Sequence, residues 1–282
     1  MTRVAILGAG GKMGCRLTDN LLKSEANHEL LLVEVSEQGQ ANIAQRNLKV
    51  TPEGEALARA DVLILALPDR ILGKVAAETV PKLNAGTIVI TLDPAAAHSG
   101  ELPDRPDISY FVTHPCHPNV FDHFETPEER DDFFGGVHAR QSIVCALWQG
   151  PEEHYEIAES LAKEFYGPVK RSHRITVEQM AILEPTMAET CSIALIRALR
   201  ETLEEAVRRG VPREAAQDFL YGHIKVELGI AFGLAPFPFS DGAQLISGYG
   251  KEQIFKEDWL KVFEPESVKQ QTKMIVKGTV EM

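Results

Sequence analysis

The sequence predicts an α/β protein, a Rossmann doubly wound and mostly parallel sheet followed by an all-helical domain with one long helix. Two observations predict this fold class. Short β-branched segments alternate with helical segments in the first part of the chain, and a glycine-rich turn joins the first strand to the first helix. In the second part, apolar residues keep helical spacing for about 34 residues, from Thr176 to Arg209.

The composition is that of a globular protein, and it excludes a disordered or collagen-like chain. The 282 residues include 29 Lys and Arg against 41 Asp and Glu, which gives a formal net charge of −12. This excess of negative charge repels phosphate backbones and anionic lipids. No apolar run approaches the ~18 residues that a transmembrane helix needs. We therefore expect a small-molecule substrate, and neither nucleic acid nor a membrane as a partner.

The cysteine pattern favours a reducing compartment. The chain has four cysteines, at positions 15, 116, 145 and 191, and they form no CxxC pair. The N-terminal residues do not show the basic and apolar pattern of a secretory signal peptide. We expect free thiols and a cytoplasmic protein.

The first strand, expected over residues 1–7, runs directly into a glycine-rich turn, and a helix is expected from Cys15 to Lys23. Glycine is needed in such a turn because a Cβ would block a positive φ and would keep backbone N–H groups away from a pyrophosphate. The sequence therefore predicts a nucleotide cradle made of Gly8, Gly10, Gly11, Lys12, Met13 and Gly14.

An acidic residue ends the second expected strand, residues 29–35. Glu34 follows Gly14 by twenty residues, the interval at which an acid accepts hydrogen bonds from a ribose 2′-hydroxyl and repels a 2′-phosphate. This predicts NAD as the cofactor in preference to NADP. Two alternatives remain: a solvated acid at the end of a strand, and an Arg46 side chain that folds back to accommodate a 2′-phosphate.

The alternation continues with expected strands at 61–67, 87–92, 109–113, 141–147 and 169–173 and helices at 71–80 and 152–166. Ligands of doubly wound sheets bind at the carboxyl ends of the strands. Segments 67–69 and 93–95 should therefore border the nicotinamide, and Pro68 and Asp69 are cofactor-binding candidates. We predict a dinucleotide-binding domain over residues 1–174 and a helical substrate and dimerisation domain over residues 175–282.

The long helix ends at Gly210, and we expect a bend at Pro185. Its length, ~51 Å at 1.5 Å per residue, exceeds what so small a domain can cover, which favours a homodimer through this helix. A second helix is expected from Arg213 to about Phe232, and the charged tail is expected to be partly helical.

Residues that could bind a metal follow the expected strand at 109–113, in the segment Thr113-His-Pro-Cys-His-Pro-Asn119. A closed structural zinc site would need two more ligands at matching spacing, which the chain lacks. A catalytic site with an open position needs fewer protein ligands. We therefore select His114 and Glu184 as metal-ligand candidates. The alternative for His114 is a loop histidine that only hydrogen-bonds substrate or backbone.

Glu189 and His223 are the candidate catalytic residues. On an ideal helix Glu184 and Glu189 point about 140° apart, so only local unwinding at Pro185 would bring both to one site. A solvated helix position is the alternative for Glu189. His223 lies among apolar neighbours on the second helix, where Lys225 is either a contact for a substrate carboxylate or a surface lysine.

Longer motifs resemble known families. The opening segment, Val4 to Gly14, looks like that of dihydrodipicolinate reductases, but the second-domain signature of that family is absent. The whole chain resembles the 6-phosphogluconate dehydrogenase-like superfamily, which implies an eight-strand nucleotide domain. Within it, three segments resemble the D-apionate oxidoisomerase family of bacterial apiose catabolism: Thr113-His-Pro-Cys-His-Pro-Asn-Val-Phe121, Phe133-Phe-Gly-Gly-Val-His138 and Glu184-Pro-Thr-Met-Ala-Glu-Thr-Cys191.

This resemblance implies that D-apionate is oxidised at C2 by NAD and that a hydroxymethyl group then migrates from C3 to C2, giving 3-oxo-isoapionate. Such an α-ketol shift, which ketol-acid reductoisomerases run in the opposite order, needs a cation and a base. It implies His114 and Glu184 as ligands of a divalent metal (zinc, manganese or magnesium) and Glu189 as base or third ligand.

Other enzyme mechanisms and a non-enzymatic function remain as alternatives. Sugar-acid dehydrogenases of the same fold use a lysine on the long helix, but no lysine occurs from Thr176 to Ile196, and the first basic residue is Arg197. The remaining alternatives are a metal-free hydroxyacid dehydrogenase without rearrangement and a non-enzymatic NAD-sensing protein.

Overall fold

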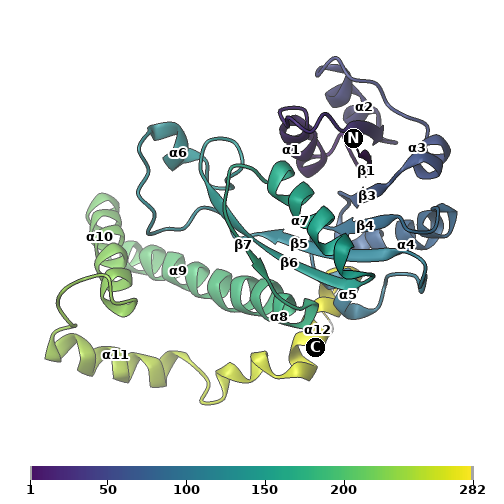
Figure 1. Ribbon diagram of the computed structural model, residues 1–282. Helices are drawn as coiled ribbons and strands as arrows, with labels where there is room; N and C mark the ends of the chain where they lie inside the picture. The colour runs from purple at the N-terminus through teal and green to yellow at the C-terminus, as the bar shows by residue number, and fades with distance from the viewer. Residues whose placement is uncertain (1, 281–282) are drawn as a thin grey trace. The chain divides into compact units, whose positions relative to one another are not determined.

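The computed structural model describes residues 2–280, and a seven-stranded sheet forms its centre, in the order β2-β1-β3-β4-β5-β6-β7 (Figure 1). All neighbouring strands are parallel except β5 and β6, which are antiparallel. This confirms the predicted doubly wound, mostly parallel sheet. The strands are β1 (Arg3–Leu7), β2 (Glu29–Val33), β3 (Val62–Leu65), β4 (Ile88–Thr91), β5 (Ser109–Pro115), β6 (Gln141–Gln149) and β7 (Val169–Arg174).

The superfamily resemblance implied eight strands, whereas residues 2–280 form a sheet of seven. Residue 1, the start of the predicted first strand, and residues 281 and 282, the end of the predicted helical domain, lie outside the described residues.

Helices cover both faces of the sheet because strand residues alternate between two apolar cores. Val4 and Ile6 of β1 point into the core that contains α1 (Lys12–Leu21) and α7 (Glu152–Phe165). Ala5 and Leu7 point into the opposite core, which contains α3 (Glu53–Arg59) and α4 (Asp69–Thr79). The other helices of this part of the chain are α2 (Glu37–Ala44), α5 (Ala95–Ser99), α6 (Pro127–Asp131), α8 (Val177–Ala181) and α12 (Pro265–Lys277), with a 3-10 turn at Val80–Lys82.

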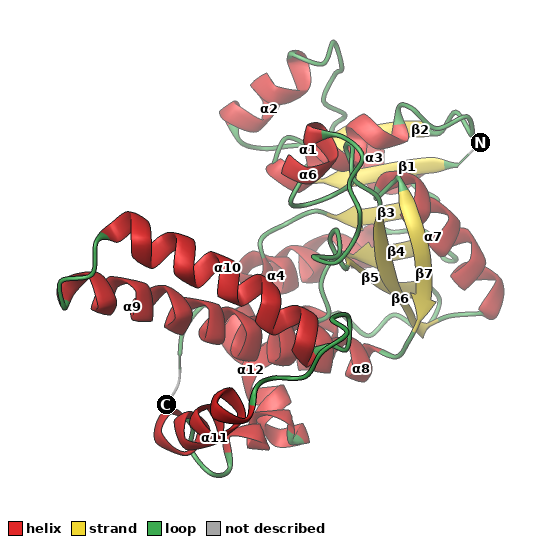
Figure 2. Ribbon diagram, turned by 90° about the vertical axis from the view of Figure 1, so that its left-hand side faces the viewer, coloured by secondary structure: helices red, strands yellow, loops and turns green. Residues whose placement is uncertain are grey.

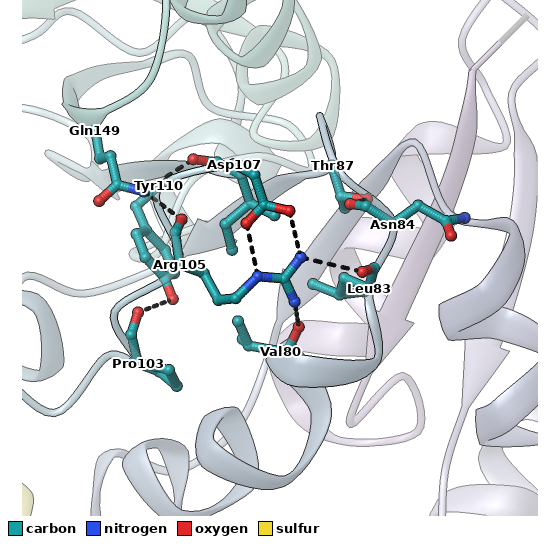
Figure 3. A network of polar contacts seen from close by, with 10 residues as sticks. Val80, Leu83, Asn84, Thr87, Pro103, Arg105, Asp107, Tyr110 and Gln149 are labelled. Atoms are coloured by element: carbon teal, nitrogen blue, oxygen red, sulfur yellow. Dashed lines mark hydrogen bonds and ion pairs between the residues drawn. The ribbon is translucent and has the colours of Figure 1, made fainter.

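Arg105 ties together the loops at the amino end of β5 (Figure 3). Its guanidinium donates hydrogen bonds to the carbonyl oxygens of Val80 and Leu83, at 3.0 and 3.3 Å, and pairs with Asp107 at 2.7 Å. The amide of Gln149, at the end of β6, donates to the carbonyl oxygen of Arg105 at 2.7 Å. These bonds join the turn after α4 to β5 and β6, which lie side by side in the sheet.

The chain divides into two compact units, which we call the sheet unit (Met1–Pro185 and Val268–Met282) and the helical unit (Thr186–Ser267). The sheet unit extends beyond the boundary predicted at residue 174, since Val177 and Met180 of α8 pack against apolar residues of β5 and β6. It also includes α12, in which Val268 and Thr272 are buried. The C-terminal helix thus belongs to the sheet unit.

The predicted long helix is present as three consecutive helical segments: α8, a π-helical segment (Ile182–Ile193) and α9 (Ala194–Arg208). Thr176 caps the start through a capping box with Gln179. Pro185 lies inside the π-helical segment. Proline has no N–H for an α-helical hydrogen bond and its ring crowds the preceding turn, which the wider π-helical turn accommodates. At Pro185 the helix is therefore widened into π-helical turns, where the sequence had led us to expect a bend.

In the helical unit, α9 and α10 (Arg213–Ala231) lie side by side (Figure 2) and are joined by an ion pair between Arg213 and Glu204, at 2.7 Å. The second predicted helix thus begins at Arg213, as expected. The rest of the unit contains α11 (Asp241–Ile254) and a 3-10 segment (Trp259–Phe263). Leu203 and Ala216 are its only buried apolar residues among those that the structure describes.

Among residues 2–280, no helix combines the length and the apolar character that crossing a bilayer would require.

Candidate functional site

The glycine-rich turn connects β1 to α1 and leaves room only for backbone. Gly8 has φ +78°, and a Cβ there would lie 2.4 Å from the carbonyl oxygen of Ala66. A Cβ on Gly14 would lie 2.1 Å from the carbonyl oxygen of Gly8. The helix begins at Lys12, earlier than the expected Cys15, and Gly11 at its N-cap provides no side-chain hydrogen bond. The first N–H groups of α1 are thus free to receive an anionic group such as a pyrophosphate.

Glu34 follows β2 and contacts the glycine-rich turn directly. Its carboxylate accepts hydrogen bonds from the backbone N–H of Gly10, at 3.0 Å, and of Val35 and Ser36, both at 2.9 Å. Burial raises the pKa of Glu34, but the hydrogen bonds from Ser36, Gly10 and Val35 outweigh it and lower the pKa below its ordinary value. A negative charge is therefore held beside the turn, where the ribose of an adenosine would lie.

Arg46, the residue that could have accommodated a 2′-phosphate, is held elsewhere. Its guanidinium binds both carboxylate oxygens of Asp19, at 2.7 and 2.9 Å, and donates to the carbonyl oxygen of Asn42. This bidentate pair directs the positive charge toward α1. The arrangement favours NAD over NADP.

Pro68 and Asp69 lie where β3 passes into α4, at the carboxyl edge of the sheet. Pro68 is the N-cap of α4, and Asp69 is its first residue. Burial raises the pKa of Asp69. The negative charge of Asp69 is one of the influences on the pKa values of His114 and Glu184, and it acts to raise both. Asp69 is therefore near the two predicted metal ligands.

Three side chains converge at this edge: Asp93, His114 and Glu184. One ligand atom from each lies within 4.8 Å of those of the other two, and His114 Nε2 is 3.7 Å from Glu184 Oε1. Asp93 follows β4, His114 lies near the end of β5, and Glu184 comes from the π-helical segment. The structure thus brings together the two predicted ligands and adds Asp93.

The hydrogen bonding of His114 leaves a lone pair on its Nε2 atom. Its Nδ1 lies 2.8 Å from the carbonyl oxygen of Pro115, which can only accept, so Nδ1 carries the proton and Nε2 faces Glu184 unprotonated. Burial, together with the neighbouring His117, lowers the pKa of His114 to about 4. The imidazole is therefore neutral near pH 7.

The donor set fits a divalent cation. One neutral imidazole and two carboxylates face a common point, and Asp69 adds a third carboxylate nearby. Burial raises the pKa of Glu184, which shows that its charge lacks full compensation from the protein. A cation among these nitrogen and oxygen donors would supply that compensation, and zinc, manganese and magnesium all accept such ligands.

The two candidate catalytic residues lie in the helical unit. Glu189 is on the π-helical segment, five residues after Glu184 and outside the three-residue cluster. His223 is on α10, where its ring stacks on Phe219 with centroids 4.0 Å apart and its Nδ1 bonds the Phe219 carbonyl oxygen. Their roles remain predictions.

Sequence reasoning placed Asp93 beside the nicotinamide but did not select it as a ligand. The signal was present, because Asp93 follows β4, His114 lies near the end of β5, and the carboxyl ends of these adjacent parallel strands meet at one edge. The prediction lacked the strand order, because no local pattern in the sequence specifies which strands are neighbours.

A pocket of about 290 Å³ adjoins the cluster at His114. One face of α1, from Lys12 to Asn20, forms one wall, and the ends of β4 and β5 form another. The remaining lining comes from the loop after β5, from the segment before β6 and its first residue, and from the end of α7 and the residue after it: His117, Phe134, Gly135, Gly136, Gln141, Phe165 and Tyr166.

Comparison with known proteins links this site to a family. A family model described as the C-terminal region of phosphogluconate dehydrogenase (decarboxylating) matches residues 122–276. A second model, described as NADP oxidoreductase, coenzyme F420-dependent, matches residues 3–94.

Relatives that match nearly the whole chain carry a more specific name. The D-apionate oxidoisomerase of Cupriavidus necator is 47% identical, with 97% of this chain and 99% of that protein covered. The D-apionate oxidoisomerase of Rhizobium rhizogenes is 46% identical, with 95% and 97% covered. A crystal structure of a semialdehyde dehydrogenase NAD-binding protein from Cupriavidus necator, in complex with calcium and NAD, has 47% identity and a TM-score of 0.95, covering 98% of this chain and 99% of that one.

The substitution Glu34→Gln tests the cofactor preference. The amide still accepts hydrogen bonds but no longer repels a 2′-phosphate, so we expect the ratio of the NADP⁺ and NAD⁺ dissociation constants to fall by about 10- to 30-fold, given ~1 kcal/mol per pair of unit charges 4 Å apart in water. Fluorescence titration measures both constants. The exposed Glu78→Gln on α4 is the control. An unchanged ratio in the Glu34 variant would show that this acid does not select the cofactor.

Proposed function

Because the chain belongs to the D-apionate oxidoisomerase family, we propose that it oxidises D-apionate with NAD and rearranges the product to 3-oxo-isoapionate. The observation that carries this proposal is the cluster of Asp93, His114 and Glu184, which adjoins a pocket that the glycine-turn helix also lines. A rearranging enzyme needs both parts: a nucleotide cradle for the oxidation and a cation site for the carbon shift.

The chemistry has two balanced steps. In the first, the C2 hydroxyl loses its proton to a base, and the C2 hydrogen leaves as hydride. In the second, a base takes the proton of the tertiary C3 hydroxyl while the hydroxymethyl carbon moves with its bonding electron pair from C3 to C2. C3 then becomes the ketone, and the former C2 carbonyl oxygen takes up a proton. When bound, NAD⁺ would accept the hydride, and a divalent cation would polarise the C2 carbonyl group.

The metal ligands in this proposal are Asp93, His114 and Glu184. The Pro115 carbonyl oxygen accepts from His114 Nδ1 and so leaves Nε2 free to coordinate. The backbone N–H of Ala95 donates to Asp93 Oδ1 at 2.7 Å, which orients that carboxylate. Calcium accompanies NAD in the Cupriavidus necator structure, which supports a divalent cation. Zinc, manganese and magnesium are the ions we propose for turnover.

The cofactor-binding residues in this proposal are those of the cradle and of the sheet edge. The NAD in the Cupriavidus necator structure supports the proposal that this chain binds NAD. Backbone N–H groups at the start of α1 hold the pyrophosphate, and Glu34 holds the adenosine ribose. Pro68 and Asp69, which follow β3 at the same carboxyl edge, complete the proposed cofactor-binding residues. The residues of the cradle are Gly8, Gly10, Gly11, Lys12, Met13 and Gly14.

Glu189 and His223 are the proposed proton-transfer groups. The shift needs a base for the tertiary hydroxyl, and carboxylate and imidazole are the side chains that most often serve as bases near neutral pH. Glu189 follows Glu184 by five positions, which is the hydrogen-bonding interval of the π-helical segment that contains both residues.

We also propose a cytoplasmic homodimer built through the helical unit. All four cysteines are free, as suits a reducing compartment. Large apolar side chains of the helical unit are exposed in the single chain, to an extent unusual for a monomer. Among them are Ile196, Phe219, Leu245, Ile246 and Tyr249, exposed by 58% or more.

Sedimentation equilibrium at micromolar concentration tests the dimer. We expect a mass of about twice the 31.1 kDa of one chain, because association buries the exposed apolar residues of α9, α10 and α11. A monomer at these concentrations would contradict the proposal.

Product analysis with and without EDTA tests the reaction. We expect NADH formation from D-apionate, a rearranged 3-oxo product by NMR, and loss of that product in EDTA with recovery on adding Mn²⁺ or Mg²⁺, because the shift needs the cation. Linear sugar acids serve as control substrates. An unrearranged 2-oxo acid formed equally well in EDTA would indicate a metal-free hydroxyacid dehydrogenase, and NAD binding without turnover of any sugar acid would indicate an NAD-sensing protein.

The substitution Asp93→Asn tests the third ligand. The amide oxygen can still accept from Ala95, so the start of α5 keeps its hydrogen bond while the negative charge is lost. We expect the Mn²⁺ dissociation constant, measured by calorimetry without substrate, to rise at least about tenfold. The matched control is Asp104→Asn, an exposed carboxylate in the loop before β5. Equal Mn²⁺ affinity in both variants would remove Asp93 from the site.

A further inference from the structure

The pocket beside His114 carries an inference that rests on the proposed function. Two groups of its lining residues have fixed relations to the proposed ligands. Lys12 and Met13 begin α1, where a pyrophosphate would bind, and His114 belongs to the proposed metal cluster. A nicotinamide ring must reach from the pyrophosphate to a substrate held at the cluster. The lining of the pocket contains residues from both ends of that path: Lys12 and Met13 at the pyrophosphate end and His114 at the substrate end.

The walls of the pocket suit a flat ring. Five apolar side chains contribute to the lining, from α1, from the ends of β4 and β5 and from the end of α7: Met13, Leu17, Leu92, Pro115 and Phe165. Such apolar walls, combined with polar lining residues such as Arg16 and Asn20, are typical of cofactor sites.

Two polar atoms in this lining are buried and have no hydrogen-bond partner in the described residues: Gln141 Oε1 and Tyr166 Oη. Each residue is only 3% exposed. A buried polar atom without a partner is costly, so a ligand that satisfies both would recover that cost.

The two atoms differ in what they can exchange. Gln141 Nε2 donates to the carbonyl oxygen of Tyr166 at 3.0 Å, so the amide cannot be reversed without placing two oxygens together, and Oε1 is left as an acceptor. Burial raises the pKa of Tyr166 well above its usual range, so the phenol keeps its proton and can donate. The pocket thus offers one acceptor and one donor.

A primary carboxamide is the complement of this pair, because its N–H donates and its carbonyl oxygen accepts. We propose that Gln141 and Tyr166 bind the carboxamide of the nicotinamide ring and thereby fix which way the ring faces the metal cluster. Ring orientation decides which face of the nicotinamide C4 receives the hydride from the substrate. Gln141 and Tyr166 are therefore positioning residues for the oxidation step.

The substitution Tyr166→Phe removes one hydroxyl and tests the donor. We expect the NAD⁺ dissociation constant to rise about fivefold to tenfold, while the constant for ADP-ribose, which lacks the ring, stays the same. Calorimetry without substrate measures both. The control is Tyr155→Phe on α7, whose hydroxyl donates to Glu159. An equal loss for ADP-ribose would overturn the proposal, because it would show general damage to the cradle.

A cofactor analogue tests the acceptor. In 3-acetylpyridine adenine dinucleotide a methyl group replaces the amide nitrogen, so it cannot donate to Gln141 Oε1. We expect the wild-type protein to bind it about tenfold more weakly than NAD⁺, and Gln141→Met to reduce that preference to about twofold or less. A preference that Gln141→Met leaves intact would overturn the assignment of Gln141.

Substrate kinetics separate this inference from the proposed function. If Tyr166→Phe raised the KM for D-apionate and left the NAD⁺ constant unchanged, the pocket would hold substrate hydroxyls and the carboxamide proposal would be wrong. If the binding differences held but no sugar acid were oxidised, the ring pocket would be supported and the proposed function contradicted. The two failures therefore give different results.

Discussion

The adjacency of β4 and β5 in a parallel sheet is the constraint on which the candidate site depends. Parallel neighbours end at the same edge, so Asp93, just after β4, and His114, near the end of β5, are brought together although twenty-one positions separate them in sequence. The residues of these strands are buried on both faces of the sheet and form part of its core. Packing of the core and placement of the chemical groups are therefore consequences of the same pattern.

Around that edge, the partly buried carboxyl groups of Asp69, Asp93 and Glu184 lie near a neutral imidazole whose protonated nitrogen is committed to a backbone carbonyl oxygen. Burial raises the pKa of Asp69 and of Glu184, so the ionised form of these two groups costs free energy. A divalent cation bound as proposed above would recover part of that cost.

The helical unit shows a comparable imbalance in apolar surface. The periodicity of α9 and α10 is that of helices with a buried face, yet Leu203 and Ala216 are the only apolar residues that the described part of this unit buries. The homodimer proposed above would cover these exposed apolar side chains.

The sequence by itself determined the local elements. Glycine spacing defined the cradle, alternation defined the strands, and helical periodicity defined the segment from Thr176 to Arg209 almost to the residue, because each of these depends on neighbours a few positions away. The position of Glu34 beside the glycine turn was equally predictable, since it depends on a fixed interval from that turn. His114 and Glu184 could be chosen by residue type and by their place after a strand and beside a proline.

Only the tertiary structure decided the rest. The strand order added Asp93 to the cluster, the return of the chain placed α12 in the sheet unit, and the conversion of the segment around Pro185 to a π-helix replaced the expected bend. Gln141 and Tyr166 gave no signal in the sequence, because a buried polar atom is recognisable only when its surroundings show that nothing pairs with it. Contacts between distant residues depend on how the elements pack, and no local pattern specifies that.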